Sequence, residues 1–204
     1  MEIRDTYRDL FADIRRKKYF FVFTVSVFLL AAASSIAASP QLKKIVLEVV
    51  DAIRRMSLGD HNRPLLSVIA KIFAHNAIAS FIALFSGVLF FFIPISAVIA
   101  NGYVTGFVVI PHLSLIGLLI PHGVFELPAF VLTFSYGIWL GLWPFRRDRI
   151  KTVKLRLRQC IAIYFCVVIP LLIIAATIEG SLIKYSLNSL FLRFSDPPIH
   201  SIIP

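Results

Sequence analysis

The residues best suited to chemistry are His122 and Glu126, which lie four positions apart in the otherwise apolar stretch 101–141. An ionisable side chain is costly in hydrocarbon, and a segment that only crossed a bilayer would not need one. The same stretch holds an Asn-Gly pair and three prolines. Because interrupted backbone in a membrane must be covered by protein or trapped water, we expect this stretch to form the functional centre, with the other segments shielding it.

The residue types alone leave three interpretations of this pair open. If the chain is helical from Gly123, both side chains share one face and could hold a metal ion with His112 or His75, although no His-Glu-x-x-His motif is present. They could also relay protons in a transporter. In the structural alternative, Glu126 is protonated or hydrogen-bonded and caps the interrupted backbone before it. The sequence favours this last alternative and predicts no metal and no other cofactor.

The composition is that of a membrane protein. Hydrophobic residues make up 58% of the 204-residue chain and charged residues only 16%, whereas about a quarter of a soluble domain is charged. The two cysteines, Cys160 and Cys166, are six positions apart in one apolar run. That spacing places them on different faces of a helix, so no disulfide or metal clip is expected. We expect one all-α membrane domain, residues 19–180, and no separate soluble domain.

Five apolar segments approach the roughly twenty residues that a transmembrane helix needs. The predicted spans are residues 19–38, 73–93, 95–110, 124–143 and 161–178. Pro94 is expected to end the second span and Gly180 the fifth, which leaves residues 181–204 as a C-terminal tail. Broken or half-helices are expected around residues 94–124, because residues 113–120 are too short to cross alone and form either a re-entrant half-helix or a connector.

Two segments outside the later spans have their own expectations. Residues 1–18 form a polar cytoplasmic segment, and the first span after it could alternatively be a signal peptide, because residues 31–39 are rich in small side chains. Residues 41–57 carry apolar side chains at helical spacing and predict an amphipathic helix. A packed connector is favoured for it over a partner-binding helix.

A block of basic residues follows the fourth span and sets the orientation. Its members, with Asp148 as the one acid among them, are Arg146, Arg147, Arg149, Lys151, Lys154, Arg156 and Arg158. Such a loop is held in the cytoplasm. With five spans in the cell membrane, this places the N-terminus on the cytoplasmic side and the C-terminus on the outer side. The predicted outside segment 39–72 carries six bases and three acids and fits this less well. We expect the block to contact anionic lipid headgroups and not nucleic acid, because no aromatic residues interleave and it adjoins the bilayer.

A succession of motifs resembles the stage II sporulation protein M family of integral membrane proteins. The specific part is the run Pro121-His122-Gly123-x-x-Glu126-Leu-Pro128-Ala129. Isolated matches flank it over residues 73–180, at Asn76, Gly87, Asn101-Gly102, Gly106, Gly141 and Ile178-Glu179-Gly180. The spacing of Gly102 and Gly106 is also one that lets two helix backbones approach closely.

What the resemblance implies is a protein that acts through partners and is not an enzyme. Family members in endospore-forming bacteria look like scaffolds that hold peptidoglycan-hydrolysing proteins at the septal membrane. We therefore expect a non-catalytic scaffold, in a homodimer or other homo-oligomer, for envelope-remodelling membrane proteins. The alternative is a transporter, channel or permease-like subunit that uses His122 and Glu126. The functional polar core expected from the resemblance is Asn76, Asn101, Gly102, Gly106, His122, Gly123, Glu126, Pro128 and Glu179.

Overall fold

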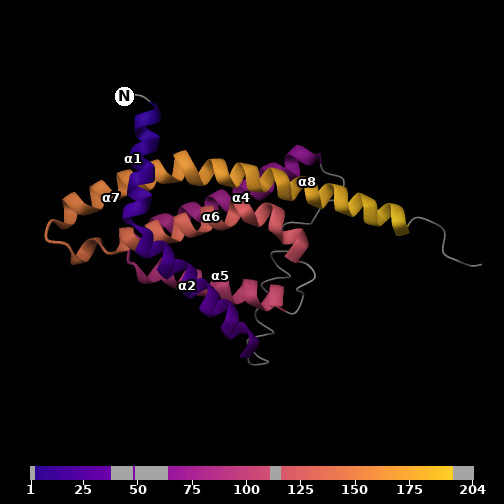
Figure 1. Ribbon diagram of the computed structural model, residues 1–204, viewed down its shortest axis with the longest axis horizontal. Helices are drawn as coiled ribbons and strands as arrows, with labels where there is room; N and C mark the ends of the chain where they lie inside the picture. The colour runs from indigo at the N-terminus through magenta and orange to yellow at the C-terminus, as the bar shows by residue number, and fades with distance from the viewer. Residues whose placement is uncertain (1–2, 38–47, 49–63, 111–115, 195–204) are drawn as a thin grey trace, which may run out of the picture.

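All regular structure in the described residues is helical (Figure 1). The computed structural model describes residues 3–37, 48, 64–110 and 116–194. In chain order its elements are α1 (Ile3–Arg16), α2 (Lys18–Ser34), η1 (Ser35–Ala37), α4 (Leu65–Ser86), α5 (Phe92–Val109), α6 (Ile116–Gly141), η3 (Trp143–Phe145), α7 (Arg149–Ile163), the π-helical segment η4 (Tyr164–Val168) and α8 (Ile169–Phe194).

The all-α polytopic fold is confirmed. Within the described residues, five helical segments are long and apolar enough to cross a membrane: Lys18–Ala37, Leu65–Ser86, Phe92–Val109, Gly123–Phe145 and Arg149–Lys184. The broken or half-helices expected around residues 94–124 are not found in the described part of that range: residues 94–109 belong to α5, and residues 116–124 are continuous helix within α6. Residues 111–115 lie outside the described residues. The predicted amphipathic helix 41–57 lies outside the described residues except for Glu48.

The predicted second span, residues 73–93, was wrong at both ends. α4 begins at Leu65 and includes Lys71. A membrane-spanning helix can tolerate this lysine, because a lysine near the end of a span can extend its ammonium group to the interface. The chain turns after Ser86 at Gly87, where an added Cβ would lie 2.1 Å from the carbonyl oxygen of Gly137. Pro94 does not break a helix. It lies in the first turn of α5, where the amide hydrogen that proline lacks would have no helical partner.

The predicted end of the fifth span at Gly180 was also wrong. α7, η4 and α8 form one helical run from Arg149 to Phe194, so residues 181–194 are helix and not tail. Gly180 is needed for packing and does not end the helix, because a Cβ there would lie 2.7 Å from the Cγ1 atom of Ile69. α8 therefore lies close against α4.

Two groups of helices build the bundle. α4, α6 and α8 pack side by side. α2 packs against α5 and runs obliquely to the other three helices (Figure 1). The expected close approach at Gly102 and Gly106 is confirmed. An added Cβ at Gly106 would lie 2.3 Å from the carbonyl oxygen of Ala32, and one at Gly102 would lie 2.5 Å from that of Phe28. Without side chains, these glycines let the α5 backbone touch the α2 backbone.

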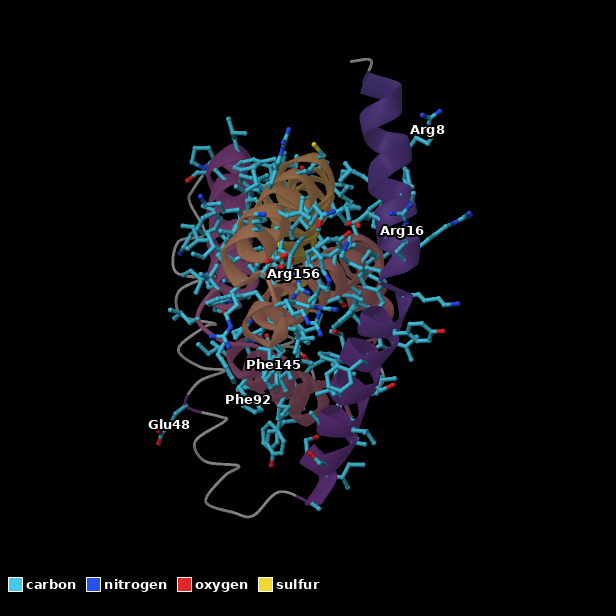
Figure 2. All side chains as sticks on the ribbon, turned by 90° about the vertical axis from the view of Figure 1, so that its left-hand side faces the viewer. Arg8, Arg16, Glu48, Phe92, Phe145 and Arg156 are labelled. Carbon is cyan, nitrogen blue, oxygen red and sulfur yellow. The ribbon has the colours of Figure 1, made fainter. Side chains whose placement is uncertain are left out.

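One end of the bundle gathers the start of α2, the α4–α5 turn and the α6–α7 connection (Figure 1). Gly141 of α6 allows close packing at this end, since a Cβ at Gly141 would lie 2.4 Å from the backbone of Phe91. The indole Nε1 of Trp143 donates a hydrogen bond of 2.9 Å to the carbonyl oxygen of Val88. α1 runs across the same end, at a steep angle to the bundle axis (Figures 1 and 2). The expected cytoplasmic orientation of this end stays a prediction.

Candidate functional site

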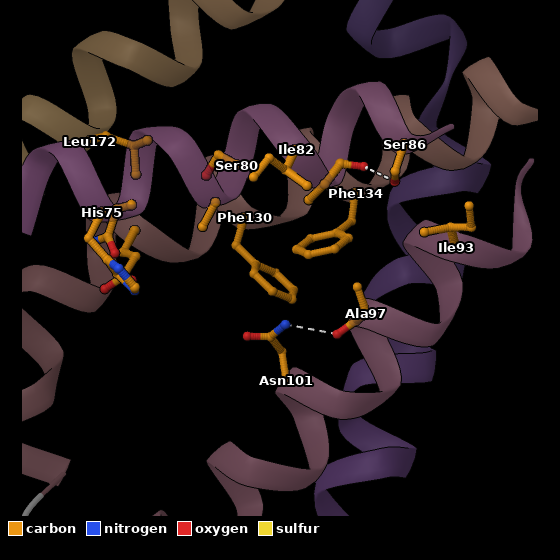
Figure 3. Close-up of a pocket in the computed structure, with 14 residues that line it drawn as sticks. His75, Ser80, Ile82, Ser86, Ile93, Ala97, Asn101, Phe130, Phe134 and Leu172 are labelled. Atoms are coloured by element: carbon orange, nitrogen blue, oxygen red, sulfur yellow. Dashed lines mark hydrogen bonds between the residues drawn. The ribbon is translucent and has the colours of Figure 1, made fainter. Parts of the chain in front are cut away.

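A half-open cavity of about 410 Å³ lies among α4, α5, α6 and α8 (Figure 3). We call it the polar groove, because six of its lining side chains are polar and come from three helices: His75, Asn76, Ser80 and Ser86 of α4, Asn101 of α5 and Glu126 of α6. Its remaining lining is largely apolar and includes Ile82, Ile93, Phe130, Phe134 and Leu172. The groove is therefore amphiphilic.

Two of the polar side chains, His75 and Asn101, lie near the middle of their spans. His75 comes ten residues after the start of α4 at Leu65, which is about 15 Å along a helix that rises 1.5 Å per residue. Asn101 is likewise central in α5. Figure 3 shows His75 at one end of the groove and Ile93 and Ser86 at the other, beside the α4–α5 turn. The end near that turn is mainly apolar, and the polar end lies at mid-span.

Hydrogen bonding decides what Asn101 offers to the groove. Its side-chain nitrogen donates a hydrogen bond of 2.8 Å to the carbonyl oxygen of Ala97 (Figure 3). A backbone carbonyl can only accept, so this bond fixes the amide with its oxygen directed away from Ala97. The hydroxyl of Ser86 is likewise engaged as a donor to the carbonyl oxygen of Ala83, at 2.8 Å. Asn101 therefore presents an acceptor to the groove.

Two acidic side chains lie near one another beside the groove. Glu126 of α6 lines it, and Glu179 of α8 is close enough to Glu126 for the two carboxyl groups to interact electrostatically. Both residues lie within membrane-spanning segments. Two carboxylates at such positions would repel each other more strongly than in water, because the dielectric constant there is low.

The fold brings some of the predicted core residues together and separates others. Asn76, Asn101 and Glu126 meet in the groove with Glu179 close by, whereas Gly102 and Gly106 pack against α2. Gly123 has open space around it and Pro128 is exposed on α6.

The histidines bear on the metal alternative. The side chains of His112 and His122 lie outside the described residues, so the pairing of His122 with Glu126 stays a prediction. His75 does line the groove. Among the described side chains no three histidine, cysteine, aspartate or glutamate residues lie together in a way that could hold a metal ion.

A second polar cluster, at the end crossed by α1, was not predicted. We call Asp13, Lys17, Tyr136, Trp139 and Arg156 the end cluster. Lys17 forms an ion pair with Asp13, and its Nζ atom lies 4.0 Å from the centroid of the Trp139 ring. The Cζ atom of Arg156 lies 4.6 Å from the Trp139 ring centroid. Burial lowers the pKa of Lys17 below its usual value, while the hydrogen bond and charge of Asp13 act in the opposite direction.

Arg156 departs from the expected headgroup contact. Only 4% of it is exposed, and it donates a hydrogen bond to the carbonyl oxygen of Trp139. In Figure 2 it lies inside the end of the bundle, whereas Arg8 and Arg16 point outward. The sequence held a signal for this, because Arg156, Cys160 and Ile163 share one helical face and all are buried. The six other basic residues of the loop are exposed: Arg146, Arg147, Arg149, Lys151, Lys154 and Arg158.

Comparison with known families gives one match. The sequence model of the family described as Stage II sporulation protein M matches residues 19–182. This range covers nearly all of the five membrane-spanning helices and both polar clusters except Asp13 and Lys17. No curated protein and no solved structure matches the chain.

Proposed function

The chain belongs to the stage II sporulation protein M family, and we propose that it is a non-catalytic membrane scaffold that assembles envelope-remodelling partners. The polar groove would receive a transmembrane helix of such a partner. The partner would carry out the chemical reaction. The described connections 87–91 and 142–148 support this, because they are too short to form a catalytic domain.

The observation that carries this proposal is the exposure of hydrogen-bonding groups at mid-span. His75 and Asn101 are exposed in the isolated chain and line the groove, and Asn101 presents an oxygen to it. Lipid tails offer these groups no hydrogen bonds, so such groups face protein or water-filled cavities in membrane proteins. A polar side chain on a partner helix would satisfy them, and interhelical hydrogen bonds of this kind contribute about 1 kcal/mol.

A photo-crosslinking experiment in living cells tests the scaffold proposal. A photoreactive amino acid replaces Ile93, which lines the groove, or Ile174, which has the same exposed fraction of 42% but does not line it. We expect the probe at position 93 to capture another membrane protein and the probe at position 174 to capture mainly lipid. Equal capture at both positions, or capture at neither, would contradict a groove that docks a partner.

A transporter or channel subunit is the second candidate, and the ionisable side chains of the groove favour it. A cavity at mid-span that reaches Glu126, with Glu179 nearby, is where a transporter would hold its cargo. Proteoliposomes with an imposed pH gradient provide the test. Proton flux that exceeds that of empty vesicles and is lost in Glu126→Gln would support transport, whereas a flux equal to that of empty vesicles would count against proton coupling.

A further inference from the structure

Independently of the scaffold role, we propose that α1 lies on the membrane surface and binds anionic phospholipid headgroups. The basic side chains that bind them are Arg15 and Arg16 of α1 and Lys18 at the start of α2, with Phe11 inserted among the acyl chains. The proposal follows from the direction of α1, the contacts that fix it and the side chains that it leaves exposed.

The direction of α1 places it along the membrane plane. The spans cross the membrane along the bundle axis, and α1 runs at a steep angle to that axis (Figures 1 and 2). Lys17 alone separates the end of α1 at Arg16 from the start of α2 at Lys18, and α2 is part of a membrane-spanning segment. The end of α1 therefore lies where the first span enters the membrane, which is the level of the lipid headgroups.

Contacts with the bundle decide which face of α1 is available. Leu10 belongs to the buried core, and the carboxylate of Asp13 accepts a hydrogen bond of 2.8 Å from the hydroxyl group of Tyr136. These contacts turn one face of the helix toward α6. Phe11 and Arg15, which are four positions apart and so share a side of the helix, lie on the face that remains. Phe11 is 64% exposed there, and Arg15 is exposed as well.

The exposed side chains suit the boundary between lipid and water. A helix that lies in this boundary carries basic residues on its polar face and residues such as phenylalanine on the face toward the acyl chains. Phe11 and Arg16 are five positions apart, which is about 140° around a helix of 3.6 residues per turn. Phe11 can therefore face the acyl chains while Arg16 faces the headgroups. Tyr19, which is 75% exposed at the start of α2, lies where aromatic rings favour the membrane interface.

The charge of the exposed face selects anionic lipids. Among the described side chains, Arg15 and Arg16 form no ion pair, whereas Lys17 is paired with Asp13. Guanidinium groups donate paired hydrogen bonds to phosphate oxygens, which all phospholipids carry. The net negative charge of an anionic lipid adds an attraction that a zwitterionic lipid lacks. We therefore expect enrichment of anionic lipid beside α1.

The basic loop lies farther along the bundle axis than α1 does. In Figure 1 the α6–α7 connection and the first residues of α7, where Arg147 and Arg149 lie, project beyond α1. These two arginines are exposed, as Arg15 and Arg16 are, but they lie at a different level. Charge alone would give both pairs the same effect on lipid, whereas the geometry favours the pair on α1.

Local fluorescence quenching tests the proposal with the full-length chain in lipid vesicles. A fluorophore is attached to Ala12→Cys, on the exposed face of α1, in a chain with Cys166→Ala, since Cys160 is fully buried. The quencher is phosphatidylglycerol or phosphatidylcholine with a nitroxide on the same acyl carbon. We expect phosphatidylglycerol to be enriched about fivefold over phosphatidylcholine at the fluorophore, which corresponds to about 1 kcal/mol, the contribution of one basic residue at an anionic surface.

Matched variants assign the enrichment to α1. Arg15→Gln with Arg16→Gln should remove most of it, and Lys18→Gln alone should reduce it by less. Arg147→Gln with Arg149→Gln, which removes the same charge, should leave it nearly unchanged. In phosphatidylcholine vesicles, a fluorophore on Phe11→Cys should be quenched more strongly by the acyl-chain nitroxide than one on Arg16→Cys.

Three results would overturn the proposal. Equal quenching by the two lipids would show that α1 does not select anionic headgroups. An equal loss of enrichment in the two double variants would show an effect of overall charge and not of α1. Quenching by neither lipid would place α1 in water, where its exposed face would be a surface for a protein partner.

Discussion

The hydroxyl group of Tyr136 donates a hydrogen bond of 2.8 Å to the carboxylate of Asp13, and this bond ties α6 to α1. Asp13 also pairs with Lys17, whose ammonium group lies over the Trp139 ring. The cluster therefore joins a helix outside the spans to the helix that carries Glu126.

Replacing Tyr136 with phenylalanine should destabilise the bundle. The variant keeps the ring but removes the hydrogen bond to a charged group, which costs about 1.5–3 kcal/mol. We expect the melting temperature of the detergent-solubilised protein to fall by several degrees. Tyr19→Phe, at a position that is 75% exposed, is the matched control and should melt like the wild type. Equal melting of both variants would contradict a stabilising role for this bond.

Lys17 should make stability depend on alkaline pH. Burial holds the pKa of folded Lys17 below the usual 10.5, so folding weakens its proton binding. The resulting penalty is fully present below the folded pKa and is relieved as pH rises from that value to the unfolded one. Relative to Lys17→Met, the wild type should therefore gain free energy of unfolding between neutral pH and pH 10.5. Chemical denaturation across that range, with the exposed Lys18→Met as control, measures it, and a loss relative to Lys17→Met would contradict the sign.

Gly106→Ala should separate α2 from α5. The new Cβ would lie 2.3 Å from the carbonyl oxygen of Ala32, and a backbone atom cannot move aside as a flexible side chain could. Overpacking of this kind costs about 1–3 kcal/mol. Gly123→Ala is the control, since nothing lies within 4 Å of a Cβ there. Size-exclusion profiles and melting curves should show a loss only for Gly106→Ala, and comparable behaviour of the two variants would argue against the close contact.

Arg156→Met should lower stability, while Arg158→Met should not. Arg156 caps a carbonyl near the C-terminus of α6, where a positive charge is favourable, and packs on the Trp139 ring. We expect a loss of about 2 kcal/mol for the hydrogen bond to a charged group. Arg158 is exposed, and exposed substitutions usually change stability by less than about 0.5 kcal/mol. Denaturant titration compares them, and a larger effect at Arg158 would reverse this assignment.

Cysteine labelling tests the predicted orientation. Single cysteines are placed at Pro64, at the start of α4, and at Arg147, both exposed, in a chain with Cys166→Ala. The native Cys160 is fully buried. A membrane-impermeant maleimide should label Pro64→Cys in intact cells and Arg147→Cys only in inside-out vesicles. The opposite pattern would place the basic loop outside the cell.

The sequence by itself determined the features that depend on local pattern. Hydropathy over about twenty residues identifies a span wherever its neighbours lie, and so the all-α fold and the number of spans were predicted. The spacing of Gly102 and Gly106 likewise predicted a close helix contact, although not that α2 would be the partner. The motif around Glu126 indicated the family, which the match to residues 19–182 bears out.

The tertiary structure decided what depends on the packing of separate helices. α4 ends at Ser86, where Gly87 lies against Gly137 of α6. Hydropathy could not locate this end, because an apolar run continues on both sides of the turn. Burial of Arg156 needs the Trp139 carbonyl of another helix. The polar groove joins His75, Asn101 and Glu126 from three helices. Sequence spacing cannot show such a meeting, because helix crossing and rotation are set by the side chains of every helix that packs there.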